Sequence, residues 1–481
     1  MSRALRESFA TPAPPGDRGV GARSSARPLL ACVALAVLSL ALPSGLGYDP
    51  WAWLVWGREL LQGTFSTVGG PSWKPLPVLV TAPASLLGDA APHVWVVVAR
   101  AGGLFAMVLC YRLAARFAGP VAGAVAVTAL VLSPDPEARW LRHLSQANID
   151  PLTAGLCLWA VERHLDQRGD HALILLGLAG LSRPEAWPFL LLYSVWWVWR
   201  DRSRWWLAAT VVLVVPALWF GGDWLGAGDP WIGAARAQVL DESVGQRFQA
   251  ALGRIVGTVP APVWLSFAAA TVLALRRADR QLLLLAAAAG VWMLEVGAMA
   301  VLLRYAALSR FLQPAVAVIC VLAGIGAVRA AGVLQARAGR RLGPVLVVLV
   351  LVAAAPFVVA RAAWLPAQAL EAAERGRIDR DLGRLALQLG GREALLACGM
   401  VVIDDSRPAL ESQASLAWKG DLLLEQVRFR APIGHPATAI VFNGGAQERL
   451  LAGAGAGARE LQRTERWAAF AVGCPAPAEI S

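Results

Sequence analysis

Charged residues are scarce in this 481-residue sequence, and lysine is nearly absent. Charged residues make up 16% of the chain and hydrophobic residues 57%, whereas soluble proteins average about 25% and 45–50%. This composition excludes an ordinary soluble protein. Only two of the 44 basic residues are lysines, so arginine carries nearly all the positive charge, and Lys74 is conspicuous in a loop after the first apolar run.

The sequence also lacks a basic stripe interleaved with aromatic residues in a polar domain. Its net charge of +11 therefore does not indicate nucleic-acid binding. Long apolar runs alternate with short connections that contain arginine. This alternation is typical of a chain that crosses a membrane repeatedly with helices of about 20 residues. The positive charge is thus a guide to membrane topology, because cytoplasmic loops collect Arg and Lys.

Cysteine is limited to six residues, with no CxxC motif and no His-rich spacing, so no metal site is predicted from a motif. Four of the cysteines lie inside apolar runs, where they act as small buried hydrophobic residues. Cys398 and Cys474 lie in the polar C-terminal region. They are candidates for a disulfide if that region is outside the cytoplasm, although spacing alone does not decide the pairing.

The arrangement of arginines predicts about eleven transmembrane helices with a cytoplasmic N-terminus and an outer C-terminus. Residues 1–27 are expected to form a disordered cytoplasmic tail. The first apolar run resembles a signal peptide but lacks a convincing cleavage site, so we expect an uncleaved helix. The expected spans are about 28–46, 93–111, 119–134, 151–163, a short hairpin over 171–206, 205–220, 261–275, 281–303, 312–328 and 344–360.

The sequence predicts three regions: the tail 1–27, a transmembrane domain 28–360 with a first outer loop 47–92, and a soluble domain 361–481. The last begins with an amphipathic helical pattern that ends at glycine. Short strand-like runs follow, separated by Gly, Pro and Asn. The predicted fold class is therefore an all-α polytopic membrane protein with a small C-terminal extracytoplasmic α/β domain. The Gly-rich stretch 452–458 is interpreted as a turn, because no nucleotide-binding unit surrounds it.

Ionisable residues beside a membrane cavity are functional candidates, because burying them without a partner is unfavourable. An acid among several cations is suited to a reaction on a phosphate-bearing lipid. Arginine binds phosphate in a bidentate manner, and a carboxylate can deprotonate an attacking hydroxyl. Four predicted outer clusters contain such residues: Asp49 with Lys74; Asp135, Glu137, Arg139, Arg142 and His143; Arg183 with Glu185; and Arg304, Tyr305 and Arg310.

Each cluster also has a structural alternative. Asp49 precedes proline at a helix start, where it would cap the helix expected over 51–62. Lys74 would extend along the membrane interface to reach water. Arg183 and Glu185 would form a structural ion pair at the hairpin tip, and the charges of 135–143 would belong to an ordinary hydrated loop.

In combination, these motifs resemble the GT-C superfamily of polyprenyl-phosphate-dependent membrane glycosyltransferases. An Asp follows the first span, a short Trp-rich helix comes next, and WKPLP leads into the following apolar stretch. The hairpin tip GLSRPEAW, the late RYAALSRFLQP segment and the C-terminal soluble domain are similar to that superfamily as well. The resemblance covers about 1–330, and its specific motifs are Asp49, Lys74-Pro75 and Arg310-Phe311.

The resemblance implies that Asp49 is the catalytic base or orients the acceptor, and that Lys74 binds the lipid phosphate. The chain departs from the common pattern, because it has KPLP where many members have Lys-Pro-Pro and lacks a clear acid pair in the second outer loop. The remaining site candidates are Arg183, Glu185, Arg304, Tyr305 and Arg310 as contacts to the donor phosphate or sugar, and Asp135 or Glu137 as a second acid.

The expected function is transfer of a sugar from a polyprenyl-phosphate donor to an acceptor on the outer face of a bacterial plasma membrane. The expected partners are the lipid-linked sugar, membrane lipids and a glycan, lipid or protein acceptor, without nucleic acid. No cofactor is predicted, and a divalent metal is left open. The alternatives are a transporter or lipid flippase, for which inverted-repeat symmetry is not visible, and a non-catalytic assembly protein that docks through its C-terminal domain.

Overall fold

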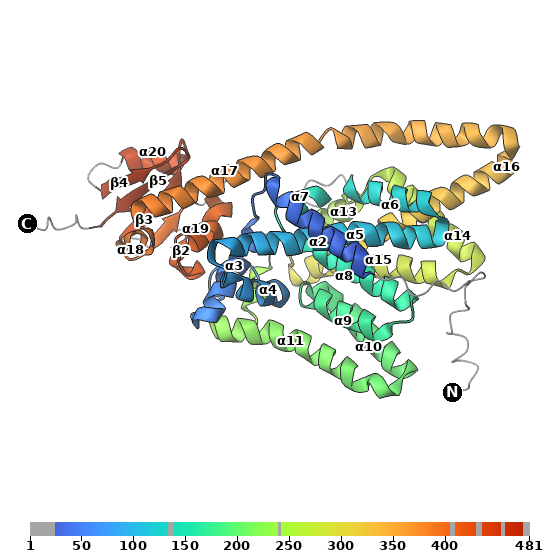
Figure 1. Ribbon diagram of the computed structural model, residues 1–481, viewed down its shortest axis with the longest axis horizontal. Helices are drawn as coiled ribbons and strands as arrows, with labels where there is room; N and C mark the ends of the chain where they lie inside the picture. Colours follow the sequence, from blue (N-terminus) through green and yellow to red (C-terminus); the bar gives the residue numbers. More distant parts are fainter. Residues whose placement is uncertain are drawn as a thin grey trace, which may run out of the picture.

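The computed structural model describes residues 25–132, 139–238, 242–404, 409–429, 435–453 and 457–474. Its larger part is a bundle of helices, and a small sheet with its own helices lies at one end of an elongated molecule (Figure 1). The helices of the larger part are α2 (Ala26–Leu38), η1 (Ser39–Ala41), α3 (Tyr48–Gln62), α4 (Pro75–Ser85), η2 (Gly88–Ala90), α5 (Ala91–Ala118), α6 (Pro120–Val131), α7 (Trp140–Ser145), α8 (Asp150–Leu165), α9 (Gly169–Gly180), η3 (Pro184–Ala186), α10 (Trp187–Arg200), η4 (Arg202–Arg204), α11 (Trp205–Ala227), α12 (Ile232–Arg236), α13 (Val244–Gly257), α14 (Ala261–Arg277), α15 (Arg280–Leu303), η5 (Ser309–Leu312) and α16 (Gln313–Ala362).

The predicted multi-pass architecture agrees with the apolar helices of the described chain, but the count of about eleven spans is not confirmed. Four helical segments are long and apolar enough to cross a membrane, and a fifth is added if α13 and α14, bent by 81°, form one broken span. Other predicted spans correspond to shorter helices, such as α6 and α9. The four long segments are Gly88–Ala118, Arg202–Ala227, Arg280–Leu303 and Ser309–Arg337.

The predicted tenth and eleventh spans lie in one element, α16, which is helical over 50 residues. Figure 1 shows its ribbon reversing direction at the end farthest from the sheet, so that its second part runs back toward the C-terminal domain. The expected non-helical connection between the two spans is therefore absent over this described stretch.

Small residues allow the long helices to approach closely. A Cβ built on Gly326 of α16 would lie 1.9 Å from the backbone oxygen of Ser266 in α14, and one on Gly324 would lie 2.2 Å from the backbone oxygen of Ala122 in α6. Only glycine fits these contacts, as is common where membrane helices pack backbone to backbone. These contacts fix α16 against the bundle just beyond η5, which carries Arg310.

The C-terminal region is an α/β unit around a mixed five-stranded sheet with strand order β2-β1-β3-β5-β4. The strands β1 and β2 are parallel, β1 and β3 are parallel, and β5 is antiparallel to both β3 and β4. Four strand-like runs seen in the sequence form strands, whereas the polar strand β4 was not predicted. The elements are α17 (Leu365–Leu389), α18 (Gly391–Leu396), β1 (Val401–Ile403), η6 (Ala409–Ser412), α19 (Gln413–Lys419), η7 (Leu424–Gln426), β2 (Val427–Arg428), β3 (Ala437–Phe442), α20 (Ala446–Gly453), β4 (Ala458–Arg463) and β5 (Trp467–Val472).

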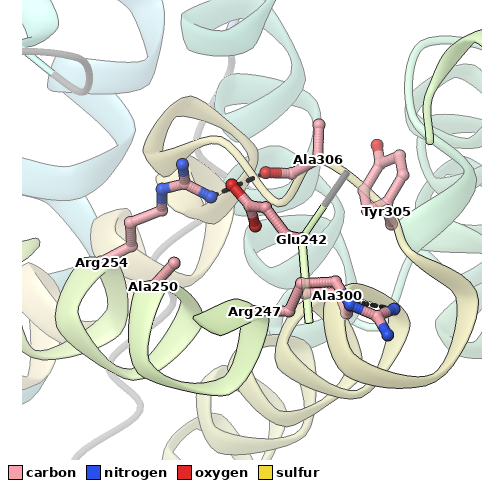
Figure 2. A pocket seen from close by; sticks show the side chains of 7 residues that line it. All are labelled: Glu242, Arg247, Ala250, Arg254, Ala300, Tyr305 and Ala306. Carbon is pink, nitrogen blue, oxygen red and sulfur yellow. Dashed lines mark hydrogen bonds between the residues drawn. The ribbon is translucent and has the colours of Figure 1, made fainter. Parts of the chain in front are cut away.

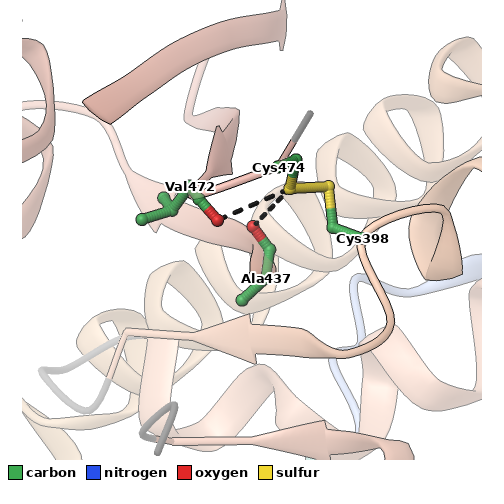
Figure 3. The surroundings of a disulfide bond; sticks show 4 residues. All are labelled: Cys398, Ala437, Val472 and Cys474. Carbon is green, nitrogen blue, oxygen red and sulfur yellow. Dashed lines mark hydrogen bonds between the residues drawn. A yellow bond between two sulfur atoms is a disulfide. The ribbon is translucent and has the colours of Figure 1, made fainter. Parts of the chain in front are cut away.

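A disulfide joins Cys398 and Cys474, whose Cα atoms lie 5.6 Å apart (Figure 3). Cys398 lies just before β1 and Cys474 just after β5, so the bond links the chain entering the sheet to the chain leaving it. The four other cysteines are free thiols that are buried or half-buried.

The C-terminal unit is anchored to α3, the helix that has Asp49, the predicted catalytic residue, in its first turn. Arg58 donates to the backbone oxygens of Trp418 (3.1 Å) and Leu422 (2.6 Å). The fully buried Glu59 accepts hydrogen bonds from the backbone N–H groups of Leu424 (2.9 Å) and Ser66 (3.2 Å). The C-terminal unit therefore helps to fix the orientation of α3.

Candidate active site

The segment between α2 and α5, predicted to be the first outer loop, positions one carboxylate and one ammonium group at the starts of two helices. Gly47 is extended and precedes α3, which places Asp49 in its first turn, where the helix dipole favours a negative charge. Lys74 is extended because it precedes Pro75, and the proline begins α4. In the motifs YDP and KP, a proline at the start of a helix thus helps to position the neighbouring charged side chain, Asp49 or Lys74.

Asp49 and Lys74 meet in the interior, and Arg310 joins them. The Asp49 Oδ2 atom lies 3.4 Å from Lys74 Nζ and 3.2 Å from a terminal nitrogen of Arg310. Asp49 and Lys74 are each only 7% exposed, whereas the Arg310 side chain is 22% exposed. The capping residue of α3 is Gly47 and not Asp49, and the Asp49 carboxylate pairs with cations from distant segments.

The pKa values follow from this environment. Burial alone would raise the pKa of Asp49, but Arg310, Lys74 and Arg183 outweigh it and lower the pKa to about 2. Burial lowers the pKa of Lys74, and Asp49 opposes this effect. Asp49 is therefore a carboxylate surrounded by positive charge.

A second buried acid was missed from the sequence. Asp150 lies in the first turn of α8 and forms an ion pair with Arg183, and its other oxygen is 3.9 Å from Nδ1 of His143. Burial alone would lower the pKa of Arg183, but Asp150 and Glu185 raise it. The available signal was the dipeptide Asp150-Pro151, which repeats the Asp-Pro start of α3.

Glu185 and Tyr305 extend the cluster on the other side of Arg183. The Tyr305 hydroxyl donates to Glu185 Oε1 (2.9 Å), and the same oxygen lies 3.9 Å from an Arg183 nitrogen. Tyr305 stacks on Phe311 with ring centroids 5.1 Å apart, and the guanidinium of Arg183 lies 3.9 Å from the Phe311 centroid. Burial, and then Glu185, raise the pKa of Tyr305. The hairpin tip and the RYAALSRF segment therefore meet here.

The remaining predicted site residues are not in this cluster. Arg304 is exposed at the end of α15 in a left-handed conformation (φ 57°), and within the described chain it makes no ion pair with the cluster. The proposed second acids Asp135 and Glu137 lie outside the described residues. Across the described ranges, no group of three or more His, Cys, Asp or Glu side chains is arranged to hold a metal ion.

Helix α13 holds the backbone of the segment that carries Tyr305. Arg254 donates to the backbone oxygen of Ala306 (2.7 Å), and Arg247 donates to that of Ala300 (3.4 Å). Figure 2 shows these arginines around a small cavity of about 20 Å³ beside Tyr305. The opposite face of α13 exposes four apolar side chains spaced one helical turn apart: Val244, Phe248, Leu252 and Val256.

Comparison with solved structures shows which fold this is. A crystal structure of ArnT from Cupriavidus metallidurans in the apo state matches with a TM-score of 0.54 and 18% identity, covering 93% of this chain and 98% of that one. The same protein bound to undecaprenyl phosphate matches with a TM-score of 0.54 and 16% identity, with the same coverage. The chain has the GT-C fold.

The GT-C resemblance predicted from the sequence is thereby confirmed at the level of the fold. The archaeal oligosaccharyltransferase AglB from Archaeoglobus fulgidus, in complex with an inhibitory peptide and a dolichol-phosphate, matches with a TM-score of 0.47 and 12% identity over 86% of this chain and 69% of that one. No family profile matches the sequence, and no curated protein matches it either.

Proposed function

We propose that this chain is a glycosyltransferase that moves a sugar from a polyprenyl-phosphate donor to an acceptor on the outer face of a bacterial plasma membrane. The observation that carries the proposal is the buried carboxylate of Asp49, shared by Lys74 and Arg310. A carboxylate between two cations matches the charges of a reaction that releases a phosphate while removing a proton from a hydroxyl. The GT-C fold, shared with a protein solved with undecaprenyl phosphate, supports the same class of donor.

In the proposed mechanism, Lys74 and Arg310 bind the donor phosphate. The acceptor hydroxyl attacks the anomeric carbon, the bond from this carbon to the phosphate oxygen breaks, and the hydroxyl proton passes to Asp49. The polyprenyl phosphate leaves with its negative charge neutralised by the two cations. A single direct displacement of this kind inverts the anomeric centre.

Donor binding would also activate the base. With both cations on Asp49, the low pKa of its carboxyl makes it a weak base. A donor phosphate bound to Lys74 and Arg310 would raise the pKa of Asp49, because the two cations would then stabilise the phosphate as well as the carboxylate. Asp49 would thus become a stronger base only when the donor is present.

The second pair would serve to shape the site. Arg183 and Asp150 are almost fully buried and form an ion pair. Moving either side chain toward a ligand would leave the other as an unpaired buried charge, which is unfavourable. Arg183 adds positive charge near Asp49 and also lies over Phe311. We assign Arg183, Glu185 and Tyr305 to the sugar or phosphate side of the donor, and Asp150 to the orientation of Arg183.

The lipid tail would approach past α13. The four apolar residues on its exposed face suit contact with acyl or prenyl chains, and its other face holds the Tyr305 segment through Arg254. We place the N-terminus in the cytoplasm and the domain 361–481 outside. The Cys398–Cys474 disulfide supports this placement, because disulfides persist in oxidising compartments, and Glu59 ties α3 to the same domain.

Arg310 and Arg304 provide a matched test, because both come from the RYAALSRF segment and only Arg310 reaches Asp49. For Arg310→Gln in the purified full-length protein, we expect binding of a polyprenyl-phosphate sugar to weaken about tenfold or more, as for loss of a charged hydrogen bond. Arg304→Gln should bind normally. Equal affinities of Arg310→Gln and the unmodified chain would refute the assignment of the phosphate site.

A further inference from the structure

A second cationic site lies away from the Asp49 cluster, in a groove of about 470 Å³ between three elements. One wall is the segment 40–44, which follows α2 and leads toward α3. His93 contributes from the start of α5, and Arg377 and Arg380 contribute from α17. The groove therefore bridges the helical bundle and the first helix of the C-terminal region.

The charge on this groove is positive and partly uncompensated. Among the residues that the structure describes, no acidic side chain lines it. Arg377 is held by Glu374, with Nε and Oε2 2.7 Å apart. Arg380 has no hydrogen bond or ion pair with any residue that the structure describes, and its side chain is exposed. An exposed guanidinium beside a second one in a groove is suited to an oxyanion, which arginine can bind in a bidentate manner.

The wall formed by the segment 40–44 has exposed apolar side chains at and beside it. Leu42, in the groove, is 63% exposed, and Leu38, at the end of α2, is 70% exposed. In a chain that crosses a membrane, exposed leucines next to exposed cations at a helix end mark the level where acyl chains meet headgroups. Free phosphate would use the cations but not the leucines.

We propose that this groove binds the headgroup phosphate of an anionic phospholipid, with Arg380 as its main contact, Arg377 and His93 beside it, and the acyl chains along Leu42. A lipid bound there contacts both α17 and the segment that leads to Asp49, so it links the C-terminal region to the bundle. This inference does not depend on the transferase proposal, because it concerns binding alone.

The test uses the full-length protein in phosphatidylcholine nanodiscs that contain increasing fractions of phosphatidylglycerol. Bound lipid is counted by native mass spectrometry after release, and the melting temperature is followed in parallel. We expect phosphatidylglycerol to bind in preference to phosphatidylcholine and to raise the melting temperature, as a ligand of the native state does. Arg380→Gln should weaken this binding about fivefold, the effect of one basic residue at an anionic surface.

Arg459→Gln is the matched control, because Arg459 is an exposed arginine on β4, outside the groove. It should leave lipid binding unchanged, and the double variant Arg377→Gln/Arg380→Gln should abolish the preference for phosphatidylglycerol. Equal binding of both lipids, or an unaltered preference in the double variant, would overturn the proposal. Displacement of phosphatidylglycerol by millimolar inorganic phosphate would instead identify a free-phosphate site and would also overturn it.

Discussion

Replacing Glu59 by glutamine is expected to change how the stability of this chain depends on pH. Glu59 is fully buried between α3 and the C-terminal unit, where both of its oxygens accept backbone hydrogen bonds. Burial raises its pKa from 4.5 to about 7, although the bonds from Leu424 and Ser66 oppose this rise. The contact that fixes α3 thus contains a carboxyl group that ionises near neutral pH.

The size of the effect follows from the two pKa values. The folded chain holds the proton more tightly than the unfolded chain, so this stabilisation is fully present below pH 4.5 and is lost as the pH rises through 7. At about 1.4 kcal/mol for each pH unit between the two pKa values, ionisation of Glu59 lowers the free energy of unfolding by at most about 3–4 kcal/mol. Glutamine cannot ionise, so Glu59→Gln lacks this contribution.

The assay is thermal unfolding of the purified full-length protein, followed by tryptophan fluorescence between pH 5 and pH 8. The stability of the unmodified chain should fall relative to that of Glu59→Gln across this range. Glu393→Gln, which replaces an exposed glutamate of α18, should parallel the unmodified chain. If Glu59→Gln also parallels it, the carboxyl group does not have a raised pKa at this contact, and the reasoning is wrong.

Three further predictions concern the bundle, the sheet and the site. Gly326→Ala should lower the melting temperature, because its Cβ would meet a backbone oxygen at 1.9 Å, at a cost of about 1–3 kcal/mol. The control Gly332→Ala, whose Cβ has nothing within 4 Å, should leave the melting temperature unchanged. Equal melting temperatures of the two variants would contradict the close packing. Replacing both Cys398 and Cys474 by serine should destabilise the C-terminal unit by about 2–5 kcal/mol, measured as earlier proteolysis of that unit, and unchanged proteolysis would argue against the bond. Lys74→Met should lower both transfer and melting temperature, because it leaves a buried carboxylate short of one partner; an unchanged melting temperature would contradict the buried pair.

The sequence was most informative where a helix begins at an Asp-Pro or Lys-Pro step. Proline restricts the residue before it, so the starts of α3 and α4 were predictable, and with them the locations of Asp49 and Lys74. The contact between Asp49 and Arg310 was not predicted, because it joins segments more than 200 residues apart. The GT-C resemblance implied only that Arg310 contacts the donor phosphate or sugar. Asp150 had the same local signal as Asp49 but lay at the edge of a predicted span.

The strand β4 and the continuous α16 were not predictable from local patterns. The segment ARELQR lacks the apolar alternation of a half-buried strand, and it pairs as an edge strand because β5 offers it a partner. In α16, arginines within the helix suggested a loop, but arginine is a good helix former. Arg304 is exposed, whereas Arg310 reaches Asp49. This difference depends on the left-handed turn at the end of α15, which no sequence motif specifies.

The central claim is that Asp49 removes a proton during sugar transfer. The direct measurement is the single-turnover rate of purified full-length protein with a labelled polyprenyl-phosphate sugar and its acceptor, comparing Asp49→Asn with the exposed control Asp229→Asn. We predict a rate about 10²–10⁴-fold lower for Asp49→Asn, donor binding that is not weakened, and a normal rate for Asp229→Asn. Undiminished turnover by Asp49→Asn would contradict the account.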